Sequence, residues 1–453
     1  MNISIQQFKS ITAVDGFSFD GLTLLAGANS SGKSSIIQAL LLLKQTLEAS
    51  SDEVVALQGE YVNARDLSEL IQNNSKKRTT ISISWDVKEI DRFADTMVLT
   101  KYSSFQYAEK LSMTLTLKSV ESVVVVTDFM LSFDKQQETE SIAVHYNSKS
   151  RRYDLTSNLP NLNRNISNNA GKNGKIEVKG CKIDFLNFFP IFVSSDDEEL
   201  KEAEFTLLLM KDMRSFFVSY LKNIYYIGPN RVSPELDRFY TSDTLSDRVD
   251  STGSNTRYIL AEQKKRLVGN GTLADEVNRW IKKLGLADGV SANKDSETKH
   301  YRTSVSMNGK LKVDLCNTGF GNSQILPILV QGLLAPEGSL IIIEDPEVHM
   351  HPAVQSAMAD FFIAMAKEGK NIIIETHSDH IVTRIRRRVI ENPAVKDMIH
   401  ICYVENSYGH SEYLTLEMDD QASFLRYPEL PKGFMDAQDE DFREIMKQKL
   451  KRR

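Results

Sequence analysis

The sequence predicts an α/β fold in which a mixed or parallel sheet is flanked by helices and interrupted by a β-rich, then helical insertion. Near the start, a short apolar strand (23–26) is followed by a glycine-rich loop and an apolar helix (36–43). From residue 340, short apolar strands alternate with helices, which is typical of a parallel sheet covered by helices. Between these parts, residues 79–87 alternate apolar and polar side chains at the period of a strand.

These patterns divide the chain into an α/β region that is split by other structure. No apolar heptad is sustained over several turns, so we expect no long coiled coil. The expected parts are an N-terminal part of the α/β head (1–90), an insertion (91–225), a helical connecting region (226–310), a C-terminal part of the head (311–420) and a C-terminal tail (421–453).

Composition excludes several classes of protein. The chain has 453 residues, of which 41% are hydrophobic and 26% charged, as in ordinary globular proteins. The net charge of −6 does not indicate a nucleic-acid partner, which would need a local basic patch. Three scattered cysteines fit a reducing, cytoplasmic compartment. No apolar run approaches the roughly 20 residues of a membrane span, and we expect neither a signal peptide nor a membrane partner.

The clearest motif is GANSSGKS (27–34), which matches G-x-x-x-x-G-K-[ST] between a strand and a helix. Glycines let the backbone N–H groups face phosphate oxygens, the following helix presents its positive end, and the lysine adds a charge. A chance Gly/Ser-rich turn is the alternative, and the strand–loop–helix context disfavours it. The candidate phosphate-binding residues are Gly27, Asn29, Ser30, Gly32, Lys33, Ser34 and Ser35, with Ser34 also a candidate Mg²⁺ ligand.

An acidic strand end, LIIIEDPE (340–347), supplies the carboxylates that such a loop needs. Glu344 is the expected Mg²⁺ partner, because it ends a buried strand where ligands of α/β sheets bind. Asp345 is the candidate for activating water and Glu347 is held in reserve, and the sequence does not decide between them. A solvated acidic turn is the alternative.

A second helix start also has the residues of an anion site. In NTGFGNSQ (317–324), glycines and a hydroxyl precede an apolar helix, with Gly321, Ser323 and Gln324 as candidates. One explanation is that a second protomer's nucleotide uses this surface. An ordinary helix cap is the alternative.

Histidines and arginines follow the acidic strand. His377 ends the next strand and is expected to contact the γ-phosphate. A zinc site is the alternative use of the nearby histidines, although their spacing is not selective for zinc. Arginines at 384–388 and a basic end at 447–453 indicate either a solvated face or a contact with DNA or an effector. The four histidines of the zinc alternative are His349, His351, His377 and His380.

In this order the motifs resemble those of ABC-type ATPases of the SMC and overcoming-lysogenization-defect (OLD) group. GANSSGKS then corresponds to Walker A, TGFGNSQ to the signature, LIIIEDPE to Walker B, EVHMHP to the D-loop, and His377 to the switch histidine. The resemblance implies an ABC-type P-loop ATPase head that binds ATP and Mg²⁺. It also implies a homodimer or higher homo-oligomer in which each Walker A faces the partner's signature. No Q-loop residue stands out, and Gln58 is a weak candidate.

Two further segments, YIGPNRVSPE (226–235) and YPELPKGFMD (427–436), resemble small bacterial ATPases of the AAA-15 or AAA-21 kind. Such proteins are similar to the ATPase subunits of the PARIS and Septu anti-phage systems. This resemblance implies a nucleotide-dependent switch that controls a separate, nuclease-like effector protein. The segment after His377 is too short for the Toprim nuclease of OLD proteins, so we expect no nuclease domain here. A DNA-repair or recombination ATPase and a low-turnover nucleotide-binding scaffold remain alternatives, and the effector and trigger stay open.

Overall fold

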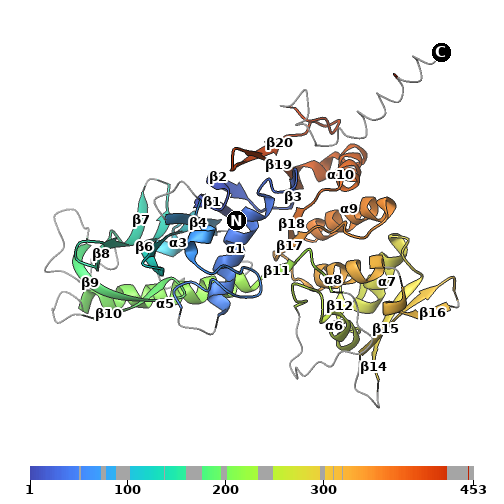
Figure 1. Ribbon diagram of the computed structural model, residues 1–453, viewed down its shortest axis with the longest axis horizontal. Coiled ribbons are helices and arrows are strands. Elements are labelled where there is room, and N and C mark those ends of the chain that lie inside the picture. Colours follow the sequence, from blue (N-terminus) through green and yellow to red (C-terminus); the bar gives the residue numbers. More distant parts are fainter. Residues whose placement is uncertain are drawn as a thin grey trace. The chain divides into compact units, whose positions relative to one another are not determined.

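The computed structural model describes two compact units (Figure 1). Unit 1 comprises Met1–Ser18, Ser34–Asn223 and Asn406–Glu412, and unit 2 comprises Phe19–Lys33, Ile224–Glu405 and Tyr413–Arg453. The tail motif at 427–436 lies outside the described residues. The structure describes residues 1–49, 53–72, 78–87, 103–136, 138–159, 176–194, 201–232, 248–295, 301–309, 311–318, 320–425 and 447.

Unit 1 is an antiparallel sheet with helices. Its strands follow the order β10-β9-β8-β7-β6-β5-β4-β1-β2. They are β1 (Asn2–Phe8), β2 (Ile11–Ser18), β4 (Arg78–Asp86), β5 (Lys110–Val120), β6 (Val123–Asp134), β7 (Thr139–Asn147), β8 (Arg152–Ser157), β9 (Ile176–Leu186) and β10 (Phe189–Ser194). The helices are α1 (Lys33–Glu48), whose first residue belongs to unit 2, η1 (Leu67–Leu70), α3 (Ser103–Gln106) and α5 (Lys201–Lys222).

An aromatic cluster forms the core between α5 and the sheet of unit 1. Trp85 of β4 lies with its ring centroid 4.9 Å from that of Phe217 and 5.2 Å from that of Tyr220. Phe189 of β10 contacts both Phe129 and Phe217. The alternation predicted for residues 79–87 is therefore confirmed: the apolar side chains of β4 are buried and the polar ones alternate with them.

Unit 2 contains the predicted parallel sheet. Its strand order is β19-β3-β18-β17-β11, and every neighbouring pair is parallel. These strands come from distant parts of the chain, so the split of the α/β region that the sequence predicts is confirmed. Their bounds are β3 (Leu22–Ala26), β11 (Ile224–Ile227), β17 (Leu340–Glu344), β18 (Asn371–Glu375) and β19 (Ile399–Ser407), and β20 (His410–Leu416) follows β19 in the chain.

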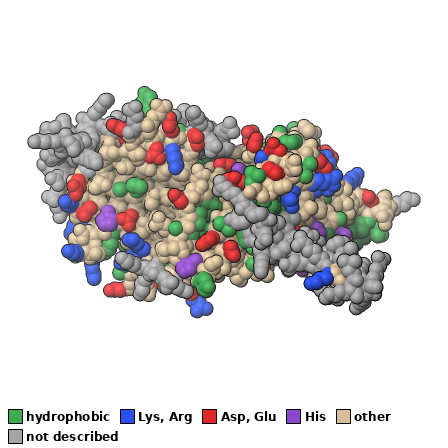
Figure 2. Space-filling model, turned by 90° about the horizontal axis from the view of Figure 1, so that it is seen from above, with side chains coloured by type: hydrophobic (Ala, Val, Ile, Leu, Met, Phe, Trp, Pro, Cys, Tyr) green, Lys and Arg blue, Asp and Glu red, His purple; other side chains and the backbone are tan. Residues whose placement is uncertain are grey.

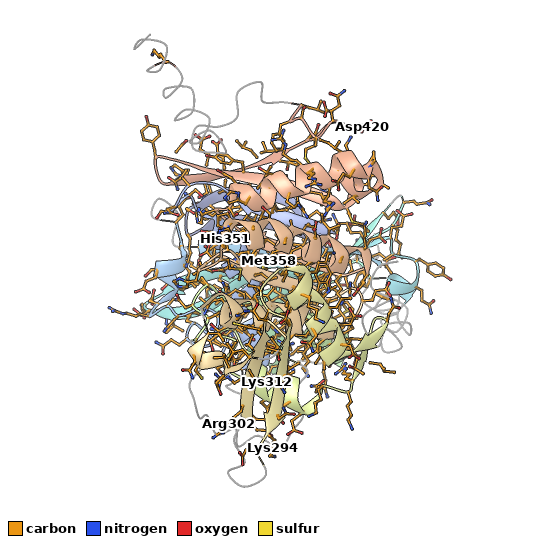
Figure 3. All side chains as sticks on the ribbon, turned by 90° about the vertical axis from the view of Figure 1, so that its right-hand side faces the viewer. Lys294, Arg302, Lys312, His351, Met358 and Asp420 are labelled. Carbon is orange, nitrogen blue, oxygen red and sulfur yellow. The ribbon has the colours of Figure 1, made fainter. Side chains whose placement is uncertain are left out.

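Helices α8, α9 and α10 lie beside one another next to these strands (Figure 1). Within this layer, Trp280 of α7 packs edge-on against Phe361 of α9 at 5.0 Å. A three-stranded antiparallel sheet precedes α8, and Figure 3 shows Lys294, Arg302 and Lys312 projecting from it. The elements are α6 (Thr256–Glu262), β12 (Leu267–Val268), β13 (Gly271–Thr272), α7 (Leu273–Lys283), β14 (Gly289–Lys294), β15 (Tyr301–Met307), β16 (Leu311–Asp314), η4 (Leu315–Asn317), α8 (Phe320–Leu334), α9 (Pro352–Lys367), α10 (Asp379–Glu391) and η5 (Pro393–Met398).

The parallel arrangement determines where a site can form in unit 2. All five strands end at the same edge of the sheet, so the segments that follow β3, β11, β17 and β18 are gathered there. Ligands of such sheets bind outside the carboxyl ends of the strands. Among the described residues, we find no helix with the length and apolar character needed to cross a lipid bilayer.

Candidate active site

The loop between β3 and α1 has the backbone that the glycine-rich motif predicts. Gly27, Ser30 and Gly32 all have positive φ, at 149°, 59° and 97°. At Gly27 a Cβ atom would lie 2.3 Å from the carbonyl oxygen of Val404 in β19, so a side chain cannot fit there. Alternating left-handed residues turn successive N–H groups toward one side, and such a concave backbone binds anions.

Lys33 lies at the centre of this loop. Its side chain is buried, and Nζ donates to the carbonyl oxygens of Gly27 at 3.1 Å and Ala28 at 2.8 Å. Burial lowers the pKa of Lys33, while the nearby charges of Glu375, Asp345 and Glu347 work in the opposite direction. The charges at the ends of β17 and β18 thus act on Lys33, and the fold brings together two motifs more than 300 residues apart in the sequence.

A cavity of about 180 Å³ opens beside the loop. Complete small-ligand pockets usually have volumes of roughly 300–1,000 Å³, so this cavity by itself accommodates part of a nucleotide, such as its phosphates. The loop between β18 and α10 forms the other wall. The lining residues are Ala26, Gly27, Ala28, Asn29, Thr376, His377, Ser378, Asp379 and Val382.

His377, the predicted γ-phosphate contact, is in this wall. Burial lowers the pKa of its imidazole, and the charge of Lys33 lowers it further. A neutral imidazole carries one donor and one acceptor, so it can hydrogen-bond a phosphate oxygen without adding charge. The imidazole Nε2 lies 4.0 Å from Asp345 Oδ1, which connects this side chain to the acidic edge.

Two glutamates end neighbouring strands at the acidic edge. Glu344 of β17 and Glu375 of β18 are partners in the parallel register, and both are buried. Sequence reasoning selected Glu344 and missed Glu375. The missed signal was the common pattern of the two strands, because LIIIE and NIIIE both place a glutamate directly after isoleucines at a strand end.

Asp345 follows Glu344 with a left-handed backbone, at φ 46°. Its N–H donates to the carbonyl oxygen of Glu375 at 2.9 Å. Its Oδ1 is buried and has no hydrogen-bond partner among the described residues. A buried carboxylate oxygen of this kind is suited to a ligand or an ordered water molecule.

Glu347 is bound differently from Asp345. Its Oε2 accepts a hydrogen bond from the Thr376 hydroxyl at 2.8 Å, and its Oε1 accepts one from the His377 N–H at 2.6 Å. Burial raises the pKa of Glu347, although both hydrogen bonds work against that shift. Glu347 thus fixes the loop that carries His377.

The donor set at this edge fits Mg²⁺. Carboxylate oxygens from Glu344 and Asp345 are the ligands that this hard cation prefers, and it usually takes one or two carboxylates together with substrate phosphates. Within the described ranges, no three His, Cys, Asp or Glu side chains gather as a complete metal site. Of the four histidines named for a zinc site, His351 has another contact: its Nδ1 accepts from the N–H of Ala353 at 3.2 Å and caps α9 (Figure 3).

The predicted second anion site lies in the first turns of α8. Gly321 is half-buried, whereas Ser323 and Gln324 are buried. The amide Nε2 of Gln324 donates to the carbonyl oxygen of Arg231 at 3.2 Å. Of the three candidates, the structure therefore turns Gln324 toward the interior of its own chain.

Two residues of the YIGPNR segment contact the acidic strand end, although no role was predicted for either of them. The Tyr226 hydroxyl hydrogen-bonds the side chain of Glu344, and burial together with this carboxylate raises the pKa of Tyr226 far above its usual value. Arg231 donates to the carbonyl oxygens of Gly228, Glu344 and Asp345. Burial lowers the pKa of Arg231 to about 10.

Other predicted residues lie in unit 1. Ser34 and Ser35 follow Lys33 in the first turn of α1, and Ser35 Oγ lies 3.1 Å from Ser10 Oγ. Gln58 forms an isolated bridge with Asn63. Their predicted roles stay predictions.

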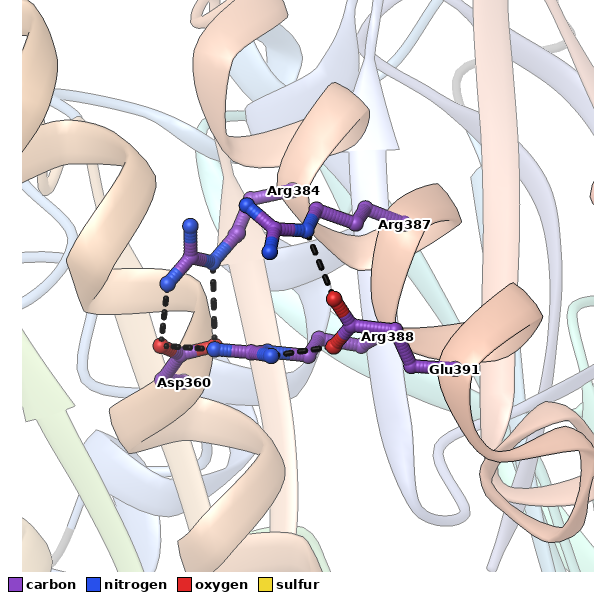
Figure 4. A network of polar contacts seen from close by, with 5 residues as sticks. All are labelled: Asp360, Arg384, Arg387, Arg388 and Glu391. Atoms are coloured by element: carbon purple, nitrogen blue, oxygen red, sulfur yellow. Dashed lines mark hydrogen bonds and ion pairs between the residues drawn. The ribbon is translucent and has the colours of Figure 1, made fainter.

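The arginines of α10 are bonded within the chain (Figure 4). Arg384 and Arg388 both donate to the buried Asp360 of α9, and Arg387 pairs with Glu391. Arg386 donates to the carbonyl oxygen of Ala422. Figure 2 shows Lys and Arg side chains gathered on one part of the face and mixed with acidic residues elsewhere. These contacts show that the α10 arginines are bonded within the chain. The basic end at 447–453 lies, apart from Lys447, outside the described residues.

Comparison with known proteins agrees with the motifs. The family described as the AAA ATPase domain matches residues 1–382. Solved structures similar to the chain include an SMC head bound to the C-terminal winged-helix domain of ScpA (14% identity, 92% of this chain and 97% of that chain, TM-score 0.46). Another is the SMC head domain from Thermotoga maritima (12% identity, 92% and 98%, TM-score 0.37).

No curated protein matches the chain at a significant level. The family match covers well over half of the sequence and includes the glycine-rich loop, the acidic strand and His377. The chain therefore belongs to the AAA ATPase domain family.

Proposed function

We propose that this protein is an ABC-type ATPase that binds and hydrolyses ATP and acts as a nucleotide-dependent dimerising switch. One observation carries the proposal: Lys33 is buried at the end of a glycine-rich loop with positive φ angles, and the charges of Asp345, Glu347 and Glu375 at the neighbouring strand ends act on its ammonium group. A lysine and carboxylates gathered beside a phosphate-binding loop are among the parts that phosphoryl transfer requires.

The loop binds the phosphates in this proposal. Its N–H groups and the start of α1 face the β- and γ-phosphates, and Lys33 neutralises part of their charge. Asn29, Ser30 and Ser35 line the same loop or its first helical turn, and His377 bonds the γ-phosphate from the opposite wall. Because the His377 N–H donates to Glu347, a movement of His377 when the γ-phosphate binds or leaves would also move Glu347 at the acidic edge.

Glu344 and Asp345 would hold Mg²⁺, which would offset the charge that develops on the phosphate. The role of Ser34 as an Mg²⁺ ligand stays a prediction from the motif. Asp345 is the better candidate for orienting the attacking water. Both oxygens of Glu347 already accept hydrogen bonds, whereas Asp345 Oδ1 has no hydrogen-bond partner among the described residues.

The ATP sandwich is the second half of the proposal. The cavity is smaller than a whole nucleotide needs, which leaves part of the ligand to be covered by another surface. Gly321 and Ser323 at the start of α8 are the proposed surface from a second copy, in a homodimer or larger homo-oligomer. ATP would favour the closed assembly, because it contacts both copies, and hydrolysis would remove that preference.

Our proposal for what the switch controls is based on the resemblance to ATPase subunits of anti-phage systems. We place the chain upstream of a separate, nuclease-like effector in bacterial defence. Within the described residues, the ion pairs of α10 give no specific support to the alternative DNA-repair ATPase. DNA-stimulated, salt-sensitive hydrolysis by the purified chain would favour that alternative, and tight ATP retention with background phosphate release would favour a scaffold.

Comparison of two carboxyl-to-amide variants tests the chemistry. Asp345→Asn should lower kcat for Mg²⁺-dependent phosphate release by about 100-fold with ATP still bound, because it removes the water-orienting charge. Glu347→Gln keeps an oxygen acceptor for the loop that carries His377 and should retain more activity. Phosphate release should be measured beside ATP affinity. The reverse order of the two kcat values would assign the role to Glu347, and wild-type protein that neither binds nor hydrolyses ATP would end the proposal.

A substitution at the start of α8 tests the sandwich. Gly321→Arg places a long, charged side chain at a half-buried position where a Cβ has room, 3.6 Å from the carbonyl oxygen of His349. ATP binding by one copy should persist, while ATP-driven assembly should be lost. Sedimentation with and without ATP measures this, and an unchanged assembly would remove α8 from the interface.

A further inference from the structure

The link between α8 and the acidic edge is the feature that the proposed mechanism leaves unused. It begins with the segment that follows β11, where Arg231 is only 6% exposed. One Arg231 nitrogen, Nη1, donates to the carbonyl oxygen of Gly228 at 2.9 Å and to that of Glu344 at 3.0 Å. The other, Nη2, donates to the carbonyl oxygen of Asp345 at 2.7 Å. A planar guanidinium therefore joins the end of β11 to the backbone of both candidate magnesium ligands.

The same residue is held from the other side by α8. The carbonyl oxygen of Arg231 accepts a hydrogen bond from Gln324 Nε2, in the second turn of that helix. Arg231 thus contacts α8 through its backbone carbonyl group, and it contacts the backbone of Glu344 and Asp345 through its guanidinium group.

A rigid turn supports this link. Asp250 accepts hydrogen bonds from the backbone or side chains of Thr252, Ser254 and Asn255. The same turn holds the segment that follows β11. The Gly228 N–H donates to the carbonyl oxygen of Ser251, and the Val232 N–H donates to that of Thr252.

The turn also packs on α8. The N–H of Val249 donates to Gln331 Oε1 at 2.7 Å. A Cβ on Gly253, whose φ is +73°, would lie 2.5 Å from Pro327, so the backbone approaches the helix as closely as only glycine permits. The segment that carries Arg231 is therefore fixed to α8 at several points.

We propose that Arg231 is a positioning residue that sets the backbone of Glu344 and Asp345 according to the position of α8. The inference rests on the proposed function, because the start of α8 is the surface assigned to the partner's nucleotide. A shift of α8 on assembly would move the carbonyl oxygen of Arg231, and its guanidinium would carry that shift to the two carboxylate-bearing residues. Hydrolysis would then depend on assembly through a contact inside each chain.

Two variants separate the paired donors of Arg231 from its charge. Arg231→Lys keeps the charge and loses the planar pair of donors, and Arg231→Gln keeps a planar amide donor and loses the charge. If Arg231 acts by positioning, both should lower kcat at least 10-fold, in the range of residues that orient metal ligands, and leave the Kd for ATP within about two-fold. If charge near the phosphates were its role, the lysine variant would retain kcat and the glutamine variant would weaken ATP binding.

Arg248→Lys is the matched control. Arg248 also donates to a carbonyl oxygen of β11, that of Ile224 at 3.2 Å, and stacks on Tyr225, but it lies at the opposite end of that strand. This control should lose a similar amount of melting temperature while kcat stays at the wild-type value.

The outcomes are distinguishable. A fall in kcat for both Arg231 variants, with ATP affinity and melting temperature near those of the control, would support the positioning role. Wild-type kcat in either variant, a matching fall in ATP affinity, or failure of both variants to fold would overturn it. A wild-type protein without ATP hydrolysis would instead remove the proposed function, and this inference with it.

Discussion

Two charged clusters of unit 2 have opposite characters. The acidic edge comprises Glu344, Asp345, Glu347 and Glu375. Several of these carboxylates interact electrostatically with the ammonium group of Lys33 and the guanidinium group of Arg231. In the α9–α10 cluster, a single carboxylate, that of Asp360, accepts hydrogen bonds from two guanidinium groups. Arg384 and Arg388 each donate to both of its oxygens (Figure 4).

The difference lies in how charges are satisfied. Burial works to raise the pKa of Asp360, but hydrogen bonds from Arg388 and Arg384 outweigh it and hold that pKa well below its usual range. At the acidic edge, burial dominates: it raises the pKa of Glu347 and lowers the pKa of Lys33. Titratable groups whose pKa values are shifted by burial are typical of functional sites, whereas a carboxylate matched by two guanidinium groups stabilises the fold.

The largest effect, on ATP binding, should come from Lys33, the lysine beside the acidic edge. Lys33→Ala removes the buried charge directed at the phosphates and should raise the Kd for ATP at least about 100-fold. Equilibrium binding of a fluorescent ATP analogue measures it. Lys396→Ala, which removes an exposed lysine paired with Asp420, is the control and should bind like wild type. Binding by Lys33→Ala within a few-fold of that control would remove the loop from the site.

A smaller effect, on stability, should come from the α9–α10 cluster. Asp360→Asn leaves Arg384 and Arg388 without their carboxylate and should lower the free energy of unfolding at pH 7 by about 2–3 kcal/mol, with kcat unchanged in the folded protein. Because the pKa of Asp360 is lower in the folded state, its stabilisation is complete above the unfolded value near 4 and is lost as the pH falls further. Urea unfolding at pH 7 and below pH 4 should show the difference between wild type and variant shrinking in acid. A constant difference would contradict the ion-pair explanation.

The smallest effect should come from the rim of the same cluster. Arg387 and Glu391 form an exposed i,i+4 pair, and such pairs contribute little because water screens them. Arg387→Ala should melt indistinguishably from wild type in a calorimetric scan. The same variant examines the DNA alternative, since DNA-stimulated phosphate release that disappears in Arg387→Ala would assign this face to nucleic acid.

Sequence reasoning found the elements that carry strong local patterns. The strand before Lys33 and the strand ending at Glu344 were predicted within one residue of their observed bounds, because apolar runs and glycines act locally. The helix predicted at 36–43 exists but extends over Lys33–Glu48, since its polar ends lack the apolar pattern. It assigned no strand to β14, β15 or β16, whose short alternating segments are interrupted by polar residues and pair only with one another.

The missed site residues share a physical reason. Tyr226 and Arg231 act through contacts with Glu344 and Asp345, more than 100 residues away, and no local pattern reports such contacts. Glu347 was placed correctly in the segment, but the hydrogen bonds from Thr376 and His377 that occupy it come from the neighbouring strand's end. The spacing of residues in the sequence predicts which side chains lie near an edge of the sheet. The fold is needed to show which of their oxygen atoms already accept hydrogen bonds.

The left-handed backbone of Asp345 restricts how this site can vary. Aspartate, asparagine and glycine tolerate that conformation, whereas most other side chains are penalised by roughly 1–2 kcal/mol. A longer carboxylate at this position would therefore carry a backbone penalty of that size, as Glu121 does at φ 50° elsewhere in the chain. Variation of the water-orienting group thus costs folding stability as well as geometry, and residues that border this turn are the less costly place to adjust the turnover rate.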